Sequence, residues 1–140
     1  MHRQVLYIVW SKKMDTGIKI VDEQHRGLVS LINTFFFHKA DADRDVDRFL
    51  VPTAEMLKAY TRLHFLTLER LMRETGYPEL EHETRLHEEM MATIRSVEAK
   101  YRASRDADGF LRFLKDYWNE HSCKAETGYI AYIKNFYGDD

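Results

Sequence analysis

The sequence is poor in cysteine, proline and glycine. Its 140 residues include one cysteine, two prolines and six glycines, and they contain no internal repeat and no low-complexity linker. The lone Cys123 cannot form a disulfide within the chain, which agrees with a protein of a reducing compartment.

The chain also lacks a charge excess and a long apolar run. Its 21 basic and 23 acidic residues nearly cancel, and no basic run is present, so nucleic acid is excluded as the expected partner. The apolar stretch 5–10 is too short to span a membrane and lacks the features of a secretory signal. We therefore expect a cytoplasmic protein with no membrane partner. A chain of this length with 44% hydrophobic residues fits a single domain, 1–140, with one continuous core.

Apolar residues recur at helical spacing in four segments that follow an irregular N-terminal arm, 1–19. The acidic run 41–45, the pair of breakers Gly76 and Pro78, and the turn-forming stretch 106–109 separate these segments. The predicted helices cover about 22–39, 46–75, 79–104 and 110–136. Four helices with short connections predict an all-α fold, an antiparallel up-down four-helix bundle with an N-terminal arm.

Each predicted helix carries one histidine within its apolar stripe. These histidines are His25, His64, His87 and His121. A single histidine on an apolar face is more often a hydrogen-bonded core residue than a ligand. Four of them converging inside one bundle are costly to bury unless something binds their lone pairs, so the pattern predicts a shared metal site.

Several short elements, in this order and at these separations, carry a resemblance that covers nearly the whole chain. They are Trp10, Gly17-Ile18, Asp22-Glu23-Gln24-His25, His64-Phe65, Leu71-Met72, Tyr77-Pro78, His87 and His121. With them the chain resembles the hemerythrin family, and within it the bacteriohemerythrins. The resemblance implies a hemerythrin-like domain with two non-haem irons, bridged by an oxo or hydroxo group and by carboxylates, and an open coordination position for dioxygen.

Five positions, His87 among them, match the family pattern directly or nearly so. His25 matches the first histidine of the family, and His64 matches the one that opens its His-Phe-x-x-Glu motif. In the last helix, His121 and Glu126 match a histidine and the bridging aspartate five residues later. Because a five-residue step is awkward in a regular helix, we expect either a locally widened turn or the longer glutamate to bring this carboxylate to the metal.

Two positions depart from the family pattern. Leu68 stands where the bridging glutamate of the second helix belongs, and Glu69, rotated by about 100°, is expected to face away from the metals. Glu83 stands where the third helix has the first of two histidines. His82 lies roughly 140° around the helix from His87, so Glu83 is the better candidate, either bridging the metals or chelating one of them.

The predicted metal ligands are therefore His25, His64, Glu83, His87, His121 and Glu126. The histidines of the first two helices serve one metal and those of the last two serve the other, with Glu126 between them. Such nitrogen and oxygen ligands suit iron, with manganese as the weaker alternative. The carboxylate lost at Leu68 predicts that the metal of the first two helices is the more weakly bound, unless Glu83 bridges.

The predicted ligand pocket also departs from the family. Its residues are Phe65, Leu68, Trp118 and Ser122. Both Trp118 and Ser122 stand where bacteriohemerythrins have apolar residues. Trp118 is bulkier than the residue it replaces, and Ser122 is polar. Because reversible dioxygen binding benefits from a dry apolar pocket, these replacements argue against a simple carrier.

Two classes of function remain open. The resemblance implies a non-haem diiron protein that binds dioxygen or another small diatomic ligand for storage, delivery or sensing. The alternative is a diiron oxidoreductase acting on dioxygen, peroxide or nitric oxide with an unknown redox partner, because more carboxylate around the metals favours higher oxidation states. A third reading is a scaffold whose site holds one metal or none.

Overall fold

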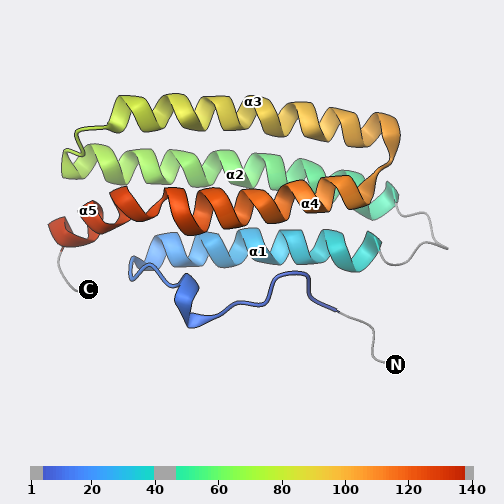
Figure 1. Ribbon diagram of the computed structural model, residues 1–140, viewed down its shortest axis with the longest axis horizontal. Helices are drawn as coiled ribbons and strands as arrows, with labels where there is room; N and C mark the ends of the chain where they lie inside the picture. Colours follow the sequence, from blue (N-terminus) through green and yellow to red (C-terminus); the bar gives the residue numbers. More distant parts are fainter. Residues whose placement is uncertain (1–4, 40–46, 138–140) are drawn as a thin grey trace.

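The computed structural model describes residues 5–39 and 47–137, which form a bundle of long helices preceded by an extended arm (Figure 1). The helical elements are the 3-10 turn η1 (Lys12–Met14), α1 (Lys19–Lys39), α2 (Asp47–Thr75), α3 (Leu80–Ser104), α4 (Ala107–Tyr117), the π-helix η2 (Trp118–Ala125) and α5 (Thr127–Tyr137). The last three follow one another and together form the fourth helix of the bundle. Neighbouring helices run in opposite directions, so the predicted all-α antiparallel up-down bundle with an N-terminal arm is confirmed.

Helix boundaries differ from the predicted ones at two starts. Helix α1 begins at Lys19, earlier than the expected residue 22. Helix α4 begins at Ala107 inside the predicted break, because Asp106 caps it by accepting a 2.9 Å hydrogen bond from the Gly109 backbone N–H. The predicted loop 41–45, the predicted helix start at 46 and the first four arm residues lie outside the described residues.

The stop between α2 and α3 is built as the sequence predicts. Gly76 has a φ of 68°, the left-handed region that favours glycine. Its backbone N–H donates to the carbonyl of Arg73 at 3.2 Å, and that of Tyr77 donates to the carbonyl of Met72 at 2.9 Å. These bonds close the last turn of α2 and send the chain back antiparallel after a short connection.

Two aromatic clusters fill the bundle on either side of its centre. In one, Phe35 stacks on Phe110 with centroids 5.1 Å apart and meets the edge of Tyr101 at 5.6 Å. In the other, Tyr77 packs edge-on against Tyr129 at 6.1 Å. Truncating a fully buried ring such as Phe35 to alanine costs about 3–5 kcal/mol, so these clusters hold the four helices at the spacing that the site needs.

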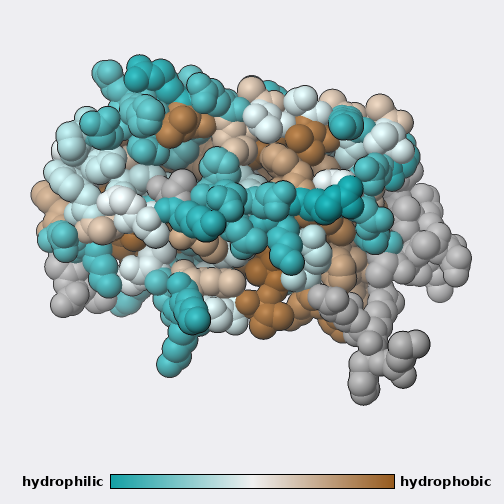
Figure 2. Space-filling model, in the orientation of Figure 1, coloured by the Kyte–Doolittle hydropathy of each residue, from teal (hydrophilic) through white to brown (hydrophobic). Residues whose placement is uncertain are grey.

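The arm is fixed to α1 by one side chain. Asn33 Oδ1 accepts hydrogen bonds from the backbone N–H groups of Tyr7 and Ile8 at 2.9 and 2.8 Å, and Asn33 Nδ2 donates to the Ile8 carbonyl at 2.8 Å. Figure 2 shows a largely hydrophilic face with apolar residues gathered on its lower part, toward the arm. Among the described helices, none combines the length and the hydrophobicity that a membrane span requires.

Candidate metal centre

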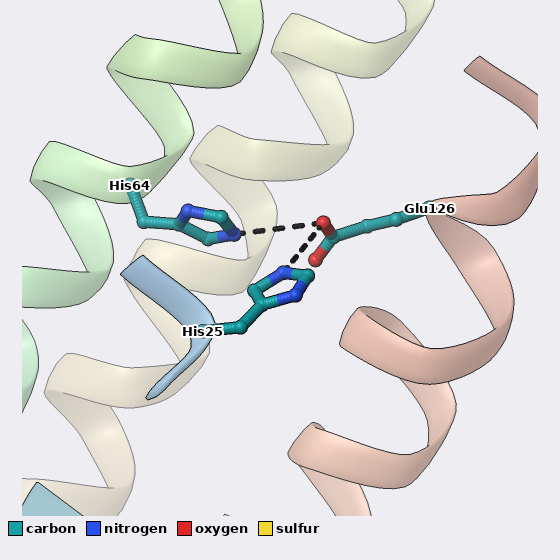
Figure 3. A group of neighbouring side chains, drawn as sticks. All are labelled: His25, His64 and Glu126. Atoms are coloured by element: carbon teal, nitrogen blue, oxygen red, sulfur yellow. Dashed lines mark hydrogen bonds and ion pairs between the residues drawn. The ribbon is translucent and has the colours of Figure 1, made fainter. Parts of the chain in front are cut away.

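Three of the predicted ligands meet in the middle of the bundle (Figure 3). His25 of α1 and His64 of α2 direct their Nε2 atoms at the same carboxylate oxygen of Glu126, at 3.0 and 3.5 Å. The ligand atoms of these three residues all lie within 4.8 Å of one another. The residues are 1%, 1% and 3% exposed, so this convergence is shielded from bulk water.

The π-helix η2 explains how Glu126 reaches this position. In a regular α-helix, residues five apart differ in direction by about 140°, so His121 and Glu126 would face different sides. Here the backbone N–H of Glu126 donates to the carbonyl of His121 at 3.2 Å, a step of five residues. The predicted widened turn is present, and it returns the carboxylate to the centre of the bundle.

Unpartnered polar atoms show that a cation fits this arrangement. Among the buried side-chain atoms of the described residues, His64 Nε2 and Glu126 Oε2 have no hydrogen-bond partner. Leaving a buried donor or acceptor unsatisfied costs about 1–3 kcal/mol, more for a charged group. A metal ion beside these atoms supplies the missing partner to both. The residues present therefore fit a bound cation, and histidine with carboxylate is a donor set that iron and manganese accept.

Electrostatics keep the Glu126 carboxylate ionised. Burial alone would raise its pKa, but the hydrogen bond with His25 and the favourable electrostatic interaction with the more distant His64 outweigh burial and lower the pKa of Glu126 to about 2. Burial first, and then the charge of Glu126, raise the pKa of the neighbouring phenols Tyr117 and Tyr129. The centre therefore presents an anionic carboxylate among neutral phenols, which suits a cation.

The other predicted ligands share a neighbouring cavity of about 270 Å³. Its walls include His87, His121, Glu83 and Glu126, with Phe65 and Tyr129 completing the side that faces the bundle. Unlike the first three ligands, these side chains do not converge: among the described residues, the compact ligand group contains only His25, His64 and Glu126. The structure thus places all six predicted ligands around one region, in one compact half and one open half.

His87 and His121 are held differently within the open half. His87 is buried, and its ring stacks on Phe65 with centroids 4.1 Å apart and planes 2° from parallel. His121 is exposed and stacks on Tyr117 at 5.5 Å. Partial burial lowers the pKa of His121, and the charge of Glu126 offsets part of that shift. His121 is therefore neutral near pH 7 and has a free lone pair to offer.

Glu83 lies half-buried in the wall of this cavity, whereas the neighbouring His82 is exposed and stands outside the lining. This placement favours Glu83 over His82 as a ligand, as the helical geometry predicted. Ligation by Glu83 stays a prediction, because its carboxylate is not part of the compact group.

Two positioning residues were missed by the sequence analysis. His64 Nδ1–H donates to Gln24 Oε1 at 2.9 Å, and Gln24 Nε2 donates to Thr67 Oγ1 at 2.9 Å. Glu69 Oε2 accepts from His87 Nδ1–H at 2.8 Å, so Glu69 stays outside the compact ligand group, as predicted, but orients His87 through the ring nitrogen that the metal does not use. Each acceptor fixes the tautomer that leaves Nε2 available to a metal. The sequence position of Glu69 could have indicated this role. Glu69 lies about 100° around α2 from the inward-facing Leu68, and this rotation points it toward α3.

The four predicted pocket residues are all buried, but they line different spaces. Phe65 faces the cavity with His87 and His121. Trp118 and Ser122 line a second cavity on the arm side, where the Trp118 ring meets the edge of His25 at 5.3 Å. Leu68 is fully buried and lines neither of them.

Comparison with known proteins agrees with this geometry. A family model described as the hemerythrin HHE cation-binding domain matches residues 16–133. The chain belongs to the hemerythrin family, whose domain binds cations.

Among its relatives is the bacteriohemerythrin of Pseudomonas aeruginosa strain LESB58, 27% identical over 131 residues that cover 92% of this chain and 83% of that protein. The bacteriohemerythrin of Stenotrophomonas maltophilia strain R551-3 is 29% identical over 112 residues, covering 79% of this chain and 71% of that protein. The crystal structure of a mutant hemerythrin matches with a TM-score of 0.76 at 20% identity, covering 91% of this chain and 98% of that chain. This last likeness shows the fold.

Proposed function

We propose that the protein is a non-haem diiron protein that binds dioxygen or a related small ligand, for storage, delivery or sensing. The observation that carries the proposal is the buried convergence of His25, His64 and Glu126 beside a cavity lined by further ligand-type side chains. In this proposal His25 and His64 hold one iron, His87 and His121 hold the other, and Glu126 lies between them. Manganese is the alternative metal.

Glu83 supplies a further carboxylate in this proposal. It lines the open cavity together with His87, His121 and Glu126. From there it would chelate the second metal or reach across to bridge, in place of the carboxylate that Leu68 lacks. Two irons held by these residues would supply redox-active metal for the uptake of dioxygen or a similar small molecule.

The surrounding side chains orient the ligands and exclude water. Gln24 and Glu69 each hold one histidine through its Nδ1–H, so the Nε2 lone pairs are aimed without any rearrangement. The Trp118 ring, 1% exposed, packs edge-on against His25 with centroids 5.3 Å apart, and Leu68 is 0% exposed on α2. A dry wall of this kind protects a bound ligand from proton-assisted loss, which supports binding over turnover.

The second candidate is a diiron oxidoreductase acting on dioxygen, peroxide or nitric oxide. Two buried hydroxyl groups favour this candidate. Ser122 Oγ and Tyr117 Oη lie beside the centre and lack hydrogen-bond partners among the described residues. Both hydroxyls can donate a hydrogen bond to a reduced oxygen species, which a reduction of dioxygen or peroxide would form. Such an enzyme would also need a one-electron donor protein.

Metal content and visible spectrum separate these functions. The protein is loaded anaerobically with ferrous iron, its iron content is measured, and its spectrum is followed through cycles of oxygenation and argon purging. A charge-transfer band that appears and disappears reversibly supports ligand binding. A band that bleaches irreversibly while peroxide is consumed supports the oxidoreductase. Absence of bound iron under these conditions overturns both.

A further inference from the structure

A cavity of about 280 Å³ lies between the arm, α1 and the η2–α5 segment, on the opposite side of the centre from the open ligand half. Its floor is made of buried side chains and its rim of exposed ones. The floor contains His25, Trp118, Ser122 and Glu126. The rim contains Lys13, Asp15 and Lys134. A water molecule occupies about 30 Å³, so this space admits a ligand of several heavy atoms.

Each floor residue has a polar atom without a hydrogen-bond partner among the described residues. These atoms are His25 Nδ1, Trp118 Nε1, Ser122 Oγ and Glu126 Oε2. Every one of these residues is more than nine-tenths buried. Unpartnered buried groups are rare in folded proteins, and several of them around one cavity indicate a polar occupant.

Three of the four unpartnered atoms are donors. The Trp118 indole N–H can only donate, and the Ser122 hydroxyl can donate. His25 points Nε2 at Glu126 and the metal position, so with a metal bound its proton lies on Nδ1. His64 and His87 find acceptors for the same proton in Gln24 and Glu69, and His25 has no acceptor among the described residues. Apart from Glu126 Oε2, which is directed at the metal position, the described residues offer no acceptor to the His25 Nδ1–H, whereas His64 and His87 each have one.

Positive charge at the rim of the cavity favours a ligand that is an anion. Lys13 and Lys134 stand at the opening. Asp15 is engaged elsewhere, accepting hydrogen bonds at 3.2 Å from Arg26 and from the Trp10 indole. The remaining acid, Glu126, is directed at the metal centre and would be neutralised by a bound cation.

We propose that this cavity binds a small planar oxyanion, of the carboxylate or nitrate type, which accepts hydrogen bonds from His25 Nδ1–H, Trp118 Nε1–H and the Ser122 hydroxyl. The anion does for His25 what Glu69 does for His87, so its binding raises the basicity of His25 and tunes the adjacent metal. This inference rests on the proposed function in one respect, because a metal on Nε2 fixes the proton of His25 on Nδ1. Trp118 and Ser122, the two residues by which the predicted ligand pocket departs from the family, supply two of the three donors.

The test uses the zinc-loaded protein, which is diamagnetic, and nitrate, which coordinates metals weakly. The chain has two tryptophans, so its ¹H–¹⁵N spectrum contains two indole signals. We expect nitrate, added at constant ionic strength, to shift the Trp118 indole signal saturably. The Trp10 indole donates to Asp15 at the rim and does not line the cavity, so its signal should shift much less than that of Trp118 and serves for comparison. Absence of a saturable Trp118 shift overturns the proposal.

Variants separate a cavity-bound anion from one bound directly to zinc. Trp118→Phe keeps a ring but removes the N–H, and Ser122→Ala removes the hydroxyl. Each should weaken nitrate binding, measured by calorimetry, by about tenfold, the loss expected for one charge-assisted hydrogen bond. Nitrate affinity that is unchanged in both variants places the anion on the metal and overturns the proposal.

A matched pair of lysines tests the charge argument. Lys134→Gln removes a rim cation and should weaken nitrate binding several-fold. Lys124→Gln makes the same change of net charge at an exposed residue that pairs with Glu120 outside the cavity, and it should leave the affinity unchanged. Equal effects of the two changes contradict a defined site. Zinc content measured on the same samples identifies failure of the metal centre separately, because that failure removes the metal and not only the anion.

Discussion

His87 and Glu69 form a hydrogen-bonded pair across the α2–α3 interface, with 2.8 Å between the imidazole Nδ1 and a carboxylate oxygen. Both side chains are largely buried, 8% and 13% exposed, so the pair is shielded from competing water. The Phe65 ring lies flat against the other side of the imidazole. The orientation of His87 is therefore set before any metal arrives.

Removing this acceptor should weaken the metal held by His87. We expect Glu69→Ala to lower the affinity for the second metal by about 10–100-fold, the usual cost of losing a ligand's orienting partner. Zinc titration against a competing chelator measures the change. Glu88→Ala, which removes an exposed carboxylate next to His87 on α3, is the control and should have no such effect. Equal affinities in the wild type and Glu69→Ala would mean that Phe65 alone orients the ring.

The two halves of the centre should fill in sequence. The carboxylate missing at Leu68 predicts the weaker metal at His25 and His64. The convergence of these two residues with Glu126 favours the opposite order, because less rearrangement is needed there. We expect two phases in a zinc titration, separated by about tenfold or more in affinity. His64→Ala should remove the tight phase, and His87→Ala should remove the weak one.

The exposed His82 provides the control for this experiment, and His82→Ala should leave both phases intact. Loss of the tight phase in His87→Ala would contradict the order proposed here. Loss of the weak phase in His82→Ala would reassign the ligand from Glu83 to His82.

Glu83 should matter for metal content. We expect Glu83→Ala to reduce bound iron from two ions toward one, because α2 offers Leu68 where a replacement carboxylate would stand. Glu89→Ala removes another glutamate from the wall of the same cavity and is the matched control. Iron analysis of purified, ferrous-loaded protein decides the matter. Two bound irons and an unchanged spectrum in Glu83→Ala would show that Glu83 is not a metal ligand.

The residues at positions 68 and 83 should be replaceable together by those of the family pattern. The double change Leu68→Glu and Glu83→His restores the family pattern, and we expect it to keep two metals. Leu68→Glu alone places a carboxylate at a position that is 0% exposed, so the metal-free protein should lose several kcal/mol of stability and regain much of it on metal binding. Urea unfolding with and without zinc measures both states. The same loss in both would show that the new carboxylate does not reach the metal.

A close approach between α1 and α2 should be sensitive to one methyl group. A Cβ built on Gly27 would lie 2.0 Å from the Tyr60 hydroxyl oxygen, one turn from His64, so something must move. Because only the far end of the Tyr60 side chain is in the way and Tyr60 is partly exposed, we expect Gly27→Ala to destabilise the protein by no more than about 1 kcal/mol in urea unfolding. Gly128→Ala is the matched control: no atom lies within 4 Å of its Cβ, and alanine should stabilise α5 by up to about 1 kcal/mol.

The fold and most of the candidate site could be predicted from sequence because their signals are local. Helical spacing places His25, His64 and His87 on inward faces, and Gly76 marks a stop whatever surrounds it. The five-residue spacing between His121 and Glu126 also predicted the widened helical turn that η2 forms.

Contacts between helices could not be predicted in the same way. Gln24 reaches His64 and Glu69 reaches His87 only because particular helix faces meet at particular heights, which spacing within one helix does not determine. The division of the predicted ligand pocket into two cavities also depends on how the helices pack against one another. Trp118 and Phe65 lie on opposite sides of the buried centre, so one predicted pocket became two cavities.

The wide turn of η2 also sets where the length of the chain can change. It holds one residue more than a regular helix would need between His121 and Glu126. Deleting the exposed Lys124 would leave these residues four apart, still on one face of an ordinary helix, with α5 in its present register. A deletion within α5 would instead turn the residues beyond it, such as Ile133, by about 100° out of the core. The π-helix is thus the point at which this bundle can gain or lose a residue and keep the same side chains facing inward.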